Sequence, residues 1–157
     1  MSYDLNQVVE QVVKTVLSTE SGLTLRQAEA LAAAVETRAK QMGMKVVVAV
    51  CDEGGNPLLL HRQEGAFIAS CDIAQNKAYT SVALQMPTKD LASLAAPGGS
   101  LYGIQFTNNG KIVIFGGGVP LIRNGKIVGG FGVSGGTAKQ DTELGDYAKQ
   151  FFAEELL

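Results

Sequence analysis

The stretch GGGVPLIRNGKIVGGFGVSGG, residues 116–136, decides the fold that the sequence predicts. Two apolar runs within it, 119–123 and 126–134, are separated by the pair Asn124-Gly125. An Asn-Gly pair between two such runs is typical of a tight β-hairpin turn, because both residues tolerate a positive φ. The stretch therefore predicts two antiparallel strands joined by a two-residue turn.

The same stretch contains Gly130, Gly132 and Gly135 in the spacing G-x-G-x-x-G, which is also the pattern of dinucleotide-binding loops. Such a loop needs a parallel strand–helix–strand unit with an acidic residue about 20 positions later, on the second strand. Only the 22 residues 136–157 follow, and their pattern is helical. We therefore expect no nucleotide cofactor. The glycines are interpreted as sites of close strand–helix packing, with a ligand approaching the bare backbone as the alternative.

The rest of the chain predicts further strands and a set of helices. The strands are expected over 46–52, 57–62 and 111–115, and the helices over 5–17, 24–42, 67–85, 88–95 and from 137 onward. Capping boxes begin two of the helices, at Thr24 with Gln27 and at Thr137 with Gln140. Strands joined mostly by hairpins predict an α+β domain, in which helices pack on an antiparallel sheet.

Composition limits the classes of function. The chain has 157 residues, which suits a single domain over residues 1–157. Its net charge is −2 and no block of Lys and Arg occurs, so we expect no nucleic acid and no membrane as partner. The N-terminus lacks the pattern of a signal peptide. Cys51 and Cys71 suit small buried side chains in a reduced protein, so a cytoplasmic location is expected.

Three segments carry a pattern that is specific when taken together: VVVAVCDEGGNPLLLHRQEGA (46–66), CDIAQNKAYTSVAL (71–84) and GGGVPLIRNGKIVGGFGVSGGTAKQD (116–141). They contain the elements G-G-x-P-L, K-A-x-T and G-x-x-x-G-x-x-G-V-S-G-G-T. With these elements the chain resembles the GlcG/HbpS family, also called the haem-degrading domain, over about residues 24–155. The same domain forms the C-terminal part of PduO-type corrinoid adenosyltransferases. Since this chain lacks the adenosyltransferase domain, we do not expect it to make adenosylcobalamin.

The resemblance implies a profilin-like α-β-α fold around a five-stranded antiparallel sheet, assembled into a homo-oligomer. It also implies a protein that binds haem or a related tetrapyrrole, with haem as the first expected ligand and a corrinoid as the second. Two alternatives stay open. The chain is an enzyme acting on haem or a small carboxylate, or it is a non-catalytic accessory protein in glycolate, diol or cobalamin-linked metabolism.

His61 is the only histidine, which excludes a metal site built on two histidines. It ends the predicted strand 57–62 beside Arg62. We interpret His61 as an axial ligand of haem iron or a proton donor near a ligand, with a surface histidine as the alternative. Arg62 is expected to pair with a haem propionate or another carboxylate.

Lys77 and Thr80 are the lysine and threonine of the element K-A-x-T, here KAYT. The resemblance makes both candidates for cofactor binding, and the lysine could pair with the same carboxylates as Arg62. In the alternative interpretation Lys77 closes a salt bridge within the protein. The expected partners for such a bridge are Asp52, Glu64 and Asp72.

The remaining polar candidates are expected to be structural. Asp52 follows a strand and suits a cap on the turn EGGN, while Asp141 lies in the first turn of the last helix, where a carboxylate is favoured. Ser134 lies in G-V-S-G-G, but no histidine follows it and the sheet is not parallel, so a nucleophile elbow is excluded. Hydrolase activity is not expected.

Overall fold

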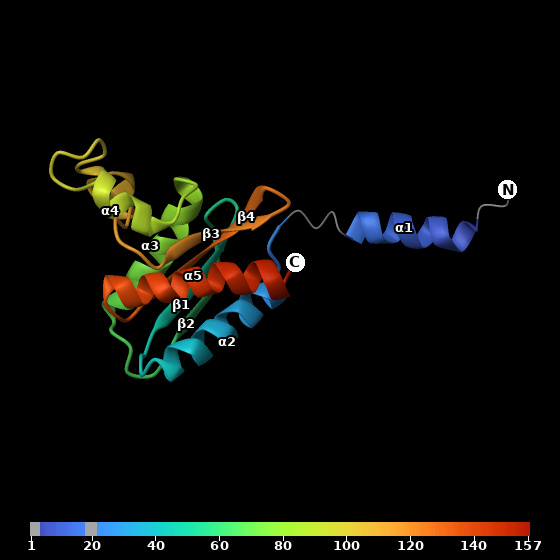
Figure 1. The fold of residues 1–157 in the computed structure, drawn as a ribbon, viewed down its shortest axis with the longest axis horizontal. Helices are drawn as coiled ribbons and strands as arrows, with labels where there is room; N and C mark the ends of the chain where they lie inside the picture. Colours follow the sequence, from blue (N-terminus) through green and yellow to red (C-terminus); the bar gives the residue numbers. More distant parts are fainter. Residues whose placement is uncertain (1–3, 18–21) are drawn as a thin grey trace.

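The order of elements in the computed structural model, which describes residues 4–17 and 22–157, is α-α-β-β-α-α-β-β-α with three short 3-10 turns between α3 and β3. The helices are α1 (Leu5–Leu17), α2 (Leu25–Gln41), α3 (Ala69–Ala83), α4 (Leu91–Leu94) and α5 (Ala138–Glu155). The strands are β1 (Val47–Asp52), β2 (Pro57–Arg62), β3 (Gly118–Arg123) and β4 (Lys126–Ser134). Figure 1 shows their arrangement.

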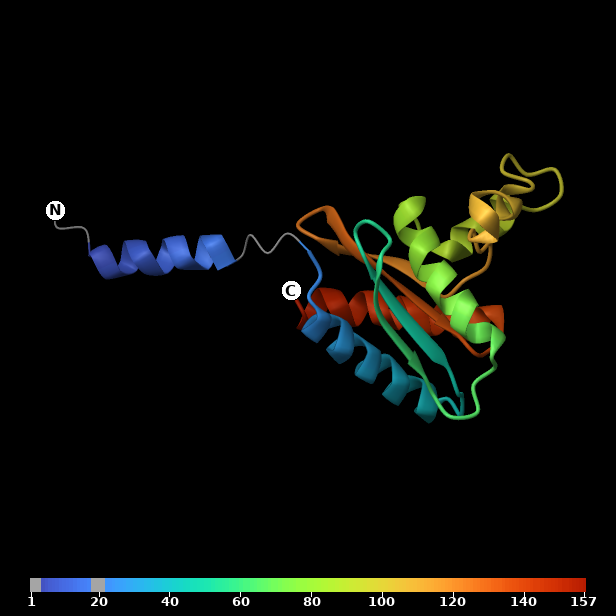
Figure 2. The same ribbon diagram turned by 180° about the vertical axis from the view of Figure 1, so that it is seen from behind.

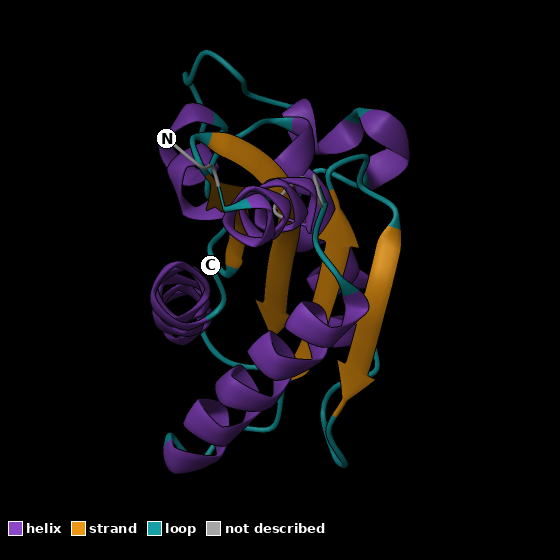
Figure 3. Cartoon of the chain, turned by 90° about the vertical axis from the view of Figure 1, so that its right-hand side faces the viewer, coloured by secondary structure: helices purple, strands orange, loops and turns teal. Residues whose placement is uncertain are grey.

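The four strands form one sheet in the order β2-β1-β4-β3, with every neighbouring pair antiparallel. Asn124 and Gly125 turn the chain between β3 and β4 with φ of 51° and 74°, as the predicted hairpin requires. The α+β class is confirmed. Helices α2 and α5 cover one face of the sheet and α3 covers the other, as Figures 1 and 3 show.

The prediction of a fifth strand over 111–115 is wrong within the described residues. Among these residues, no hydrogen bond of Lys111 or Val113 is made with a strand: Thr80 donates to the Lys111 carbonyl at 3.1 Å and accepts from the Val113 amide at 3.0 Å, and the Lys111 amide donates to the Asn108 carbonyl at 3.2 Å. The segment is therefore a loop held against α3, in which Ile112 and Val113 are as buried as strand residues would be while Lys111 and Phe115 at its ends are exposed. An apolar run has the same pattern in both settings.

Residues of β4 alternate between two different layers of the protein. Phe131 and Val133 face α2 and α5 and join the main hydrophobic core, together with Val48 and Val50 of β1. Gly130 and Gly132 face α3. A Cβ on Gly130 would lie 2.5 Å from the Ala78 carbonyl oxygen of α3, so the helix backbone rests directly on the sheet.

This contact explains the G-x-G-x-x-G spacing. The predicted role in close strand–helix packing is confirmed for Gly130 and Gly132, since any side chain there would enter α3. Gly135 is close to the backbone that enters β1, with a Cβ position 2.9 Å from the Val46 Cα. Gly130 and Gly132 thus reflect the packing of α3 on an antiparallel sheet, whereas Gly135 reflects a close approach of two backbone segments.

Both predicted capping boxes are present. Thr24 accepts from the Gln27 amide while the Gln27 side chain accepts from the Thr24 amide, and Thr137 and Gln140 make the same pair of bonds. Each box satisfies amides at the start of a helix that have no partner within the helix. The boxes fix where α2 and α5 begin on their common face of the sheet.

Helix α1 lies apart from the layered domain in Figure 1, and its apolar residues Leu5, Val8, Val9, Val12 and Val13 are exposed. Among the described residues, no helix combines the length and the apolar character that crossing a bilayer requires. The structural core is therefore formed by residues from Leu23 onward.

Candidate functional site

The predicted site residues occupy two separate places in the fold. His61 and Arg62 lie at the end of β2, which is an edge strand of the sheet. Lys77 and Thr80 lie on α3, where both side chains are buried. The structure therefore does not bring the four residues into one cluster.

His61 is fixed by a carboxylate. It is paired with Val48 in the sheet register and faces the side of α2, where its Nδ1 atom lies 2.9 Å from Glu36 Oε1. The His61 side chain is 47% exposed. In the described part of the chain, Nε2 has no hydrogen-bond partner. The imidazole thus has a defined orientation with one nitrogen free toward solvent.

Arg62 faces the other side of the sheet, because successive residues of a strand point to opposite faces. Its guanidinium donates to the Ala66 carbonyl at 2.8 Å and so holds the loop that leads to α3. Arg62 is nevertheless exposed. Further donors of the guanidinium remain available for an anionic group of a ligand.

Lys77 is fully buried at the junction of α3, β4 and α5. Its Nζ donates to Asp141 Oδ2 at 2.8 Å and to the Val133 carbonyl at 2.8 Å, and it lies 4.8 Å from the centre of the Phe115 ring. Burial lowers the pKa of Lys77, while the Asp141 charge acts against this shift. The predicted partners Asp52, Glu64 and Asp72 are wrong, since the ion pair is made with Asp141.

Asp141 and Thr80 also have protein partners. Asp141 accepts from the Gly136 amide at 2.9 Å in addition to Lys77, so it ties the start of α5 to α3. Thr80 holds the loop at Lys111 and Val113. The polar atoms of Lys77 and Thr80 are therefore used within the protein, and a role for them in cofactor binding stays a prediction.

The other polar candidates have the structural roles that were expected. Asp52 accepts from the Gly54 and Asn56 amides and closes the β1–β2 turn. Ser134 donates to Ser70 Oγ at 3.0 Å inside the protein. Burial raises the pKa of the Cys51 thiol to about 11, so it is protonated at neutral pH. Among the residues that the structure describes, no three His, Cys, Asp or Glu side chains cluster as a metal site.

A cavity of about 230 Å³, which the sequence did not predict, lies between α3, β1 and the β1–β2 turn. Its polar lining comes from Asp72, Gln75, Asn76 and Tyr79 of α3 and from Lys111. The spacing of Asp72, Gln75, Asn76 and Tyr79 at i, i+3, i+4 and i+7 was a signal of a common helix face. It did not indicate that this face borders an open space.

Comparison with known proteins agrees with this architecture. Residues 23–149 match the family model described as haem-degrading protein HbpS-like. An uncharacterised 15.0 kDa protein of Citrobacter freundii, from the dhaT–dhaS intergenic region, is 49% identical over 84% of this chain and 93% of its own length.

Two solved structures share the fold. The Klebsiella pneumoniae protein ORFY has a TM-score of 0.82 and 46% identity, covering 84% of this chain and 91% of its own. The PduOC:heme complex has a TM-score of 0.79 and 36% identity, covering 82% of this chain and 94% of its own. Since the family model spans residues 23–149, which is most of the layered domain, the chain belongs to the HbpS-like family.

Proposed function

We propose that this protein binds haem, or a related tetrapyrrole, at the edge strand β2, with His61 as the axial ligand of the iron. The observation that carries the proposal is the His61–Glu36 pair, with 2.9 Å between Nδ1 and Oε1 and a free Nε2. A histidine that ligates a metal commonly donates a hydrogen bond from its other ring N–H to a carboxylate. This bond fixes the tautomer and makes the ligating nitrogen more basic. The similarity to the PduOC:heme complex supports the choice of ligand.

The surroundings of His61 fit such a group in part. Haem has an apolar ring and anionic propionates, so it needs an axial donor, an apolar surface and a cation. Leu60, which is 43% exposed, and Arg62 are its neighbours on the same strand but point to the opposite face of the sheet, so a ligand held by His61 would reach them only around the open edge of β2. Bound haem would supply the iron, while His61 would hold the iron and Arg62 would balance a propionate charge.

The proposal includes a homo-oligomer. The outer edge of β2 has no neighbouring strand in the described chain, and half-exposed His61 offers only one side of a haem pocket. An edge strand of this kind is often covered by a second subunit. A second copy of the chain across this edge would cover the outward face of the porphyrin.

The test is a titration of the apo protein with haemin, followed at the Soret band and repeated with His61→Ala. We expect a saturable shift for the wild type and about tenfold weaker binding for the variant, because an axial bond of iron is lost. Glu36→Gln should shift the Soret band while binding persists, since it changes the hydrogen bond to Nδ1.

Lys126→Ala is the control, because Lys126 is exposed at the start of β4, which is separated from β2 by β1 in the sheet order. Binding unchanged by His61→Ala removes His61 from the role of ligand. No saturable shift removes haem from the proposal, and hydroxocobalamin is then the next tetrapyrrole to titrate. Loss of haem absorbance with a reductant and catalase present would identify an enzyme.

A further inference from the structure

The cavity beside α3 is a second site, separate from His61. His61 faces α2 on one side of the sheet, whereas the cavity lies on the opposite side, against α3. At about 230 Å³ it is smaller than the pockets that usually hold drug-sized molecules, so a porphyrin does not fit. Its occupant is therefore a small molecule, which can bind whether or not haem binds at His61.

The cavity exists because α3 is placed off centre on the sheet. The helix packs mainly on β4 and β1 and makes few contacts with β2. Its floor carries small side chains, Ala49 and Cys51 of β1 and Ala78 of α3, while Pro57 and Leu59 of β2 border it. A bulge between Val50 and Cys51 shifts the β1–β2 register at this point. The floor is thus apolar and preformed.

One end of the cavity carries a positive charge without a carboxylate partner. Lys111 Nζ lies 5.3 Å from the centre of the Tyr79 ring, and no Asp or Glu of the described residues pairs with it. The Tyr79 hydroxyl next to it accepts from Asn108 at 3.3 Å and keeps its own proton available. An ammonium and a hydroxyl donor together suit a carboxylate.

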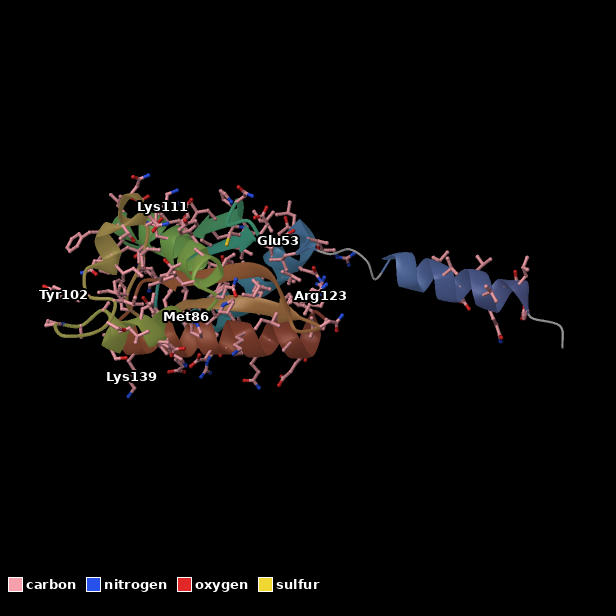
Figure 4. All side chains as sticks on the ribbon, turned by 90° about the horizontal axis from the view of Figure 1, so that it is seen from above. Glu53, Met86, Tyr102, Lys111, Arg123 and Lys139 are labelled. Atoms are coloured by element: carbon pink, nitrogen blue, oxygen red, sulfur yellow. The ribbon has the colours of Figure 1, made fainter. Side chains whose placement is uncertain are left out.

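The other end of the cavity carries side chains that can accept a hydrogen bond. Asp72 lies two helical turns before Tyr79, roughly 10 Å along the α3 axis, and makes no ion pair with the described residues. The Asn76 side chain, half-buried between them, has no hydrogen bond within the described protein. Asp72 and Asn76 are therefore free to bind a hydroxyl or an ammonium group. Figure 4 shows Lys111 and Glu53 of the β1–β2 turn on the side away from Lys139 of α5.

We propose that this cavity binds a small organic acid that carries a hydroxyl or amino group at its far end. Lys111 and Tyr79 bind the carboxylate, the short apolar body lies over Ala49 and Ala78, and Asp72 with Asn76 binds the polar end. The site is one of binding, since Cys51 at its floor is protonated and 3% exposed.

The test follows backbone amide signals by two-dimensional NMR during titration with 4-hydroxybutanoate, 4-aminobutanoate, butanoate and butylamine. We expect the first two to give saturable shifts at Gly55, Asn76, Tyr79 and Lys111, with butanoate at least about threefold weaker and butylamine without effect. Added salt should weaken binding, because Lys111 is exposed.

Two variants locate the ends of the ligand. Lys111→Gln should weaken both acids about tenfold, whereas Lys126→Gln, the same change on another exposed lysine, should leave binding unchanged. Asp72→Asn should selectively weaken 4-aminobutanoate. Shifts that arise outside the cavity, equal binding of butylamine, or an unchanged affinity in Lys111→Gln would overturn the proposal. The haemin titration tests the His61 site on the other face of the sheet. Either proposal can therefore be disproved while the other stands.

Discussion

The two faces of the sheet carry side chains of different size, although the same strands form both faces. Toward α2 and α5, strands β1 and β4 present Val48, Val50, Phe131 and Val133, and the layers are held apart by bulky side chains. Toward α3 the same strands present mostly small residues, Ala49, Cys51, Gly130 and Gly132, with Val47 as a larger exception. The backbone of α3 rests on the sheet on this side (Figure 2).

This difference in side-chain size gives the two faces different roles: one contributes mainly to stability, and the other leaves room for a ligand. The bulky face supplies most of the buried apolar surface, and its side chains fill the space between layers. The face toward α3 has small side chains. Near β2, where α3 makes few contacts with the sheet, these side chains do not fill the space below the helix, and the cavity remains. The same face contains the buried Lys77, whose pair with Asp141 connects it to α5.

The largest expected effect comes from breaking that connection. Asp141→Ala leaves the Lys77 ammonium buried with the Val133 carbonyl and the Phe115 ring as its remaining partners among the described residues. We expect the free energy of unfolding, measured with urea, to fall by about 3–5 kcal/mol. Asp146→Ala is the matched control on the same helix, because its ion pair with Lys89 is 2.9 Å long, close to the 2.8 Å of Lys77–Asp141, but exposed, and its loss should cost about 0–1 kcal/mol. Equal losses in the two variants would show that burial is not the cause.

The next effect tests whether backbone proximity shapes the α3 face. Gly132→Ala adds one methyl group, and its Cβ would lie 2.6 Å from the Ala78 amide nitrogen. Because a helix backbone cannot rotate aside as a side chain can, we expect a loss of about 1–3 kcal/mol by urea unfolding. Val133, the next residue, points to the face with the bulky side chains. There a smaller side chain is destabilising: Val133→Ala removes buried atoms and should lower the free energy of unfolding by about 1–2 kcal/mol. A neutral Gly132→Ala would contradict the contact.

The sequence predicts the fold well because its signals are local. Asn124-Gly125 and the two capping boxes depend on residues close in the chain, and all of them are confirmed. The segment 111–115 fails because its partner is Thr80, 31 residues before Lys111 on α3. No local pattern distinguishes a buried loop from a strand of the same composition.

The candidate site was harder to predict. His61 and Arg62 are adjacent in a strand, so alternation alone places them on opposite faces. Lys77 shares a helix stripe with Ala74, Ala78 and Ser81, all of them buried, which was a sign that its ammonium is paired inside the protein. That its partner is Asp141, 64 residues away, depends on how α3 and α5 meet across the end of β4.

The smallest expected effect is a dependence of stability on pH, which arises from Cys51 on the face toward α3. Burial raises the pKa of the Cys51 thiol from 9.0 to about 11, so folding favours its protonated form. A raised pKa in the folded state contributes stability below pH 9 that is lost as the pH rises toward 11. At pH 10 this loss amounts to about 1 kcal/mol.

Cys51→Ala should therefore have a flatter stability curve than the wild type between pH 8 and pH 10, measured by urea unfolding, by about 1 kcal/mol. The lowered pKa of Lys77 acts in the opposite direction, adding stability as the pH rises toward 10.5. It is present in both proteins, so the difference between their curves isolates the thiol. Cys71→Ser, which changes the half-buried cysteine, is the control and should keep the wild-type slope. If Cys51→Ala keeps that slope as well, water reaches the thiol in the folded protein, and the cavity floor is wetter than its small side chains indicate.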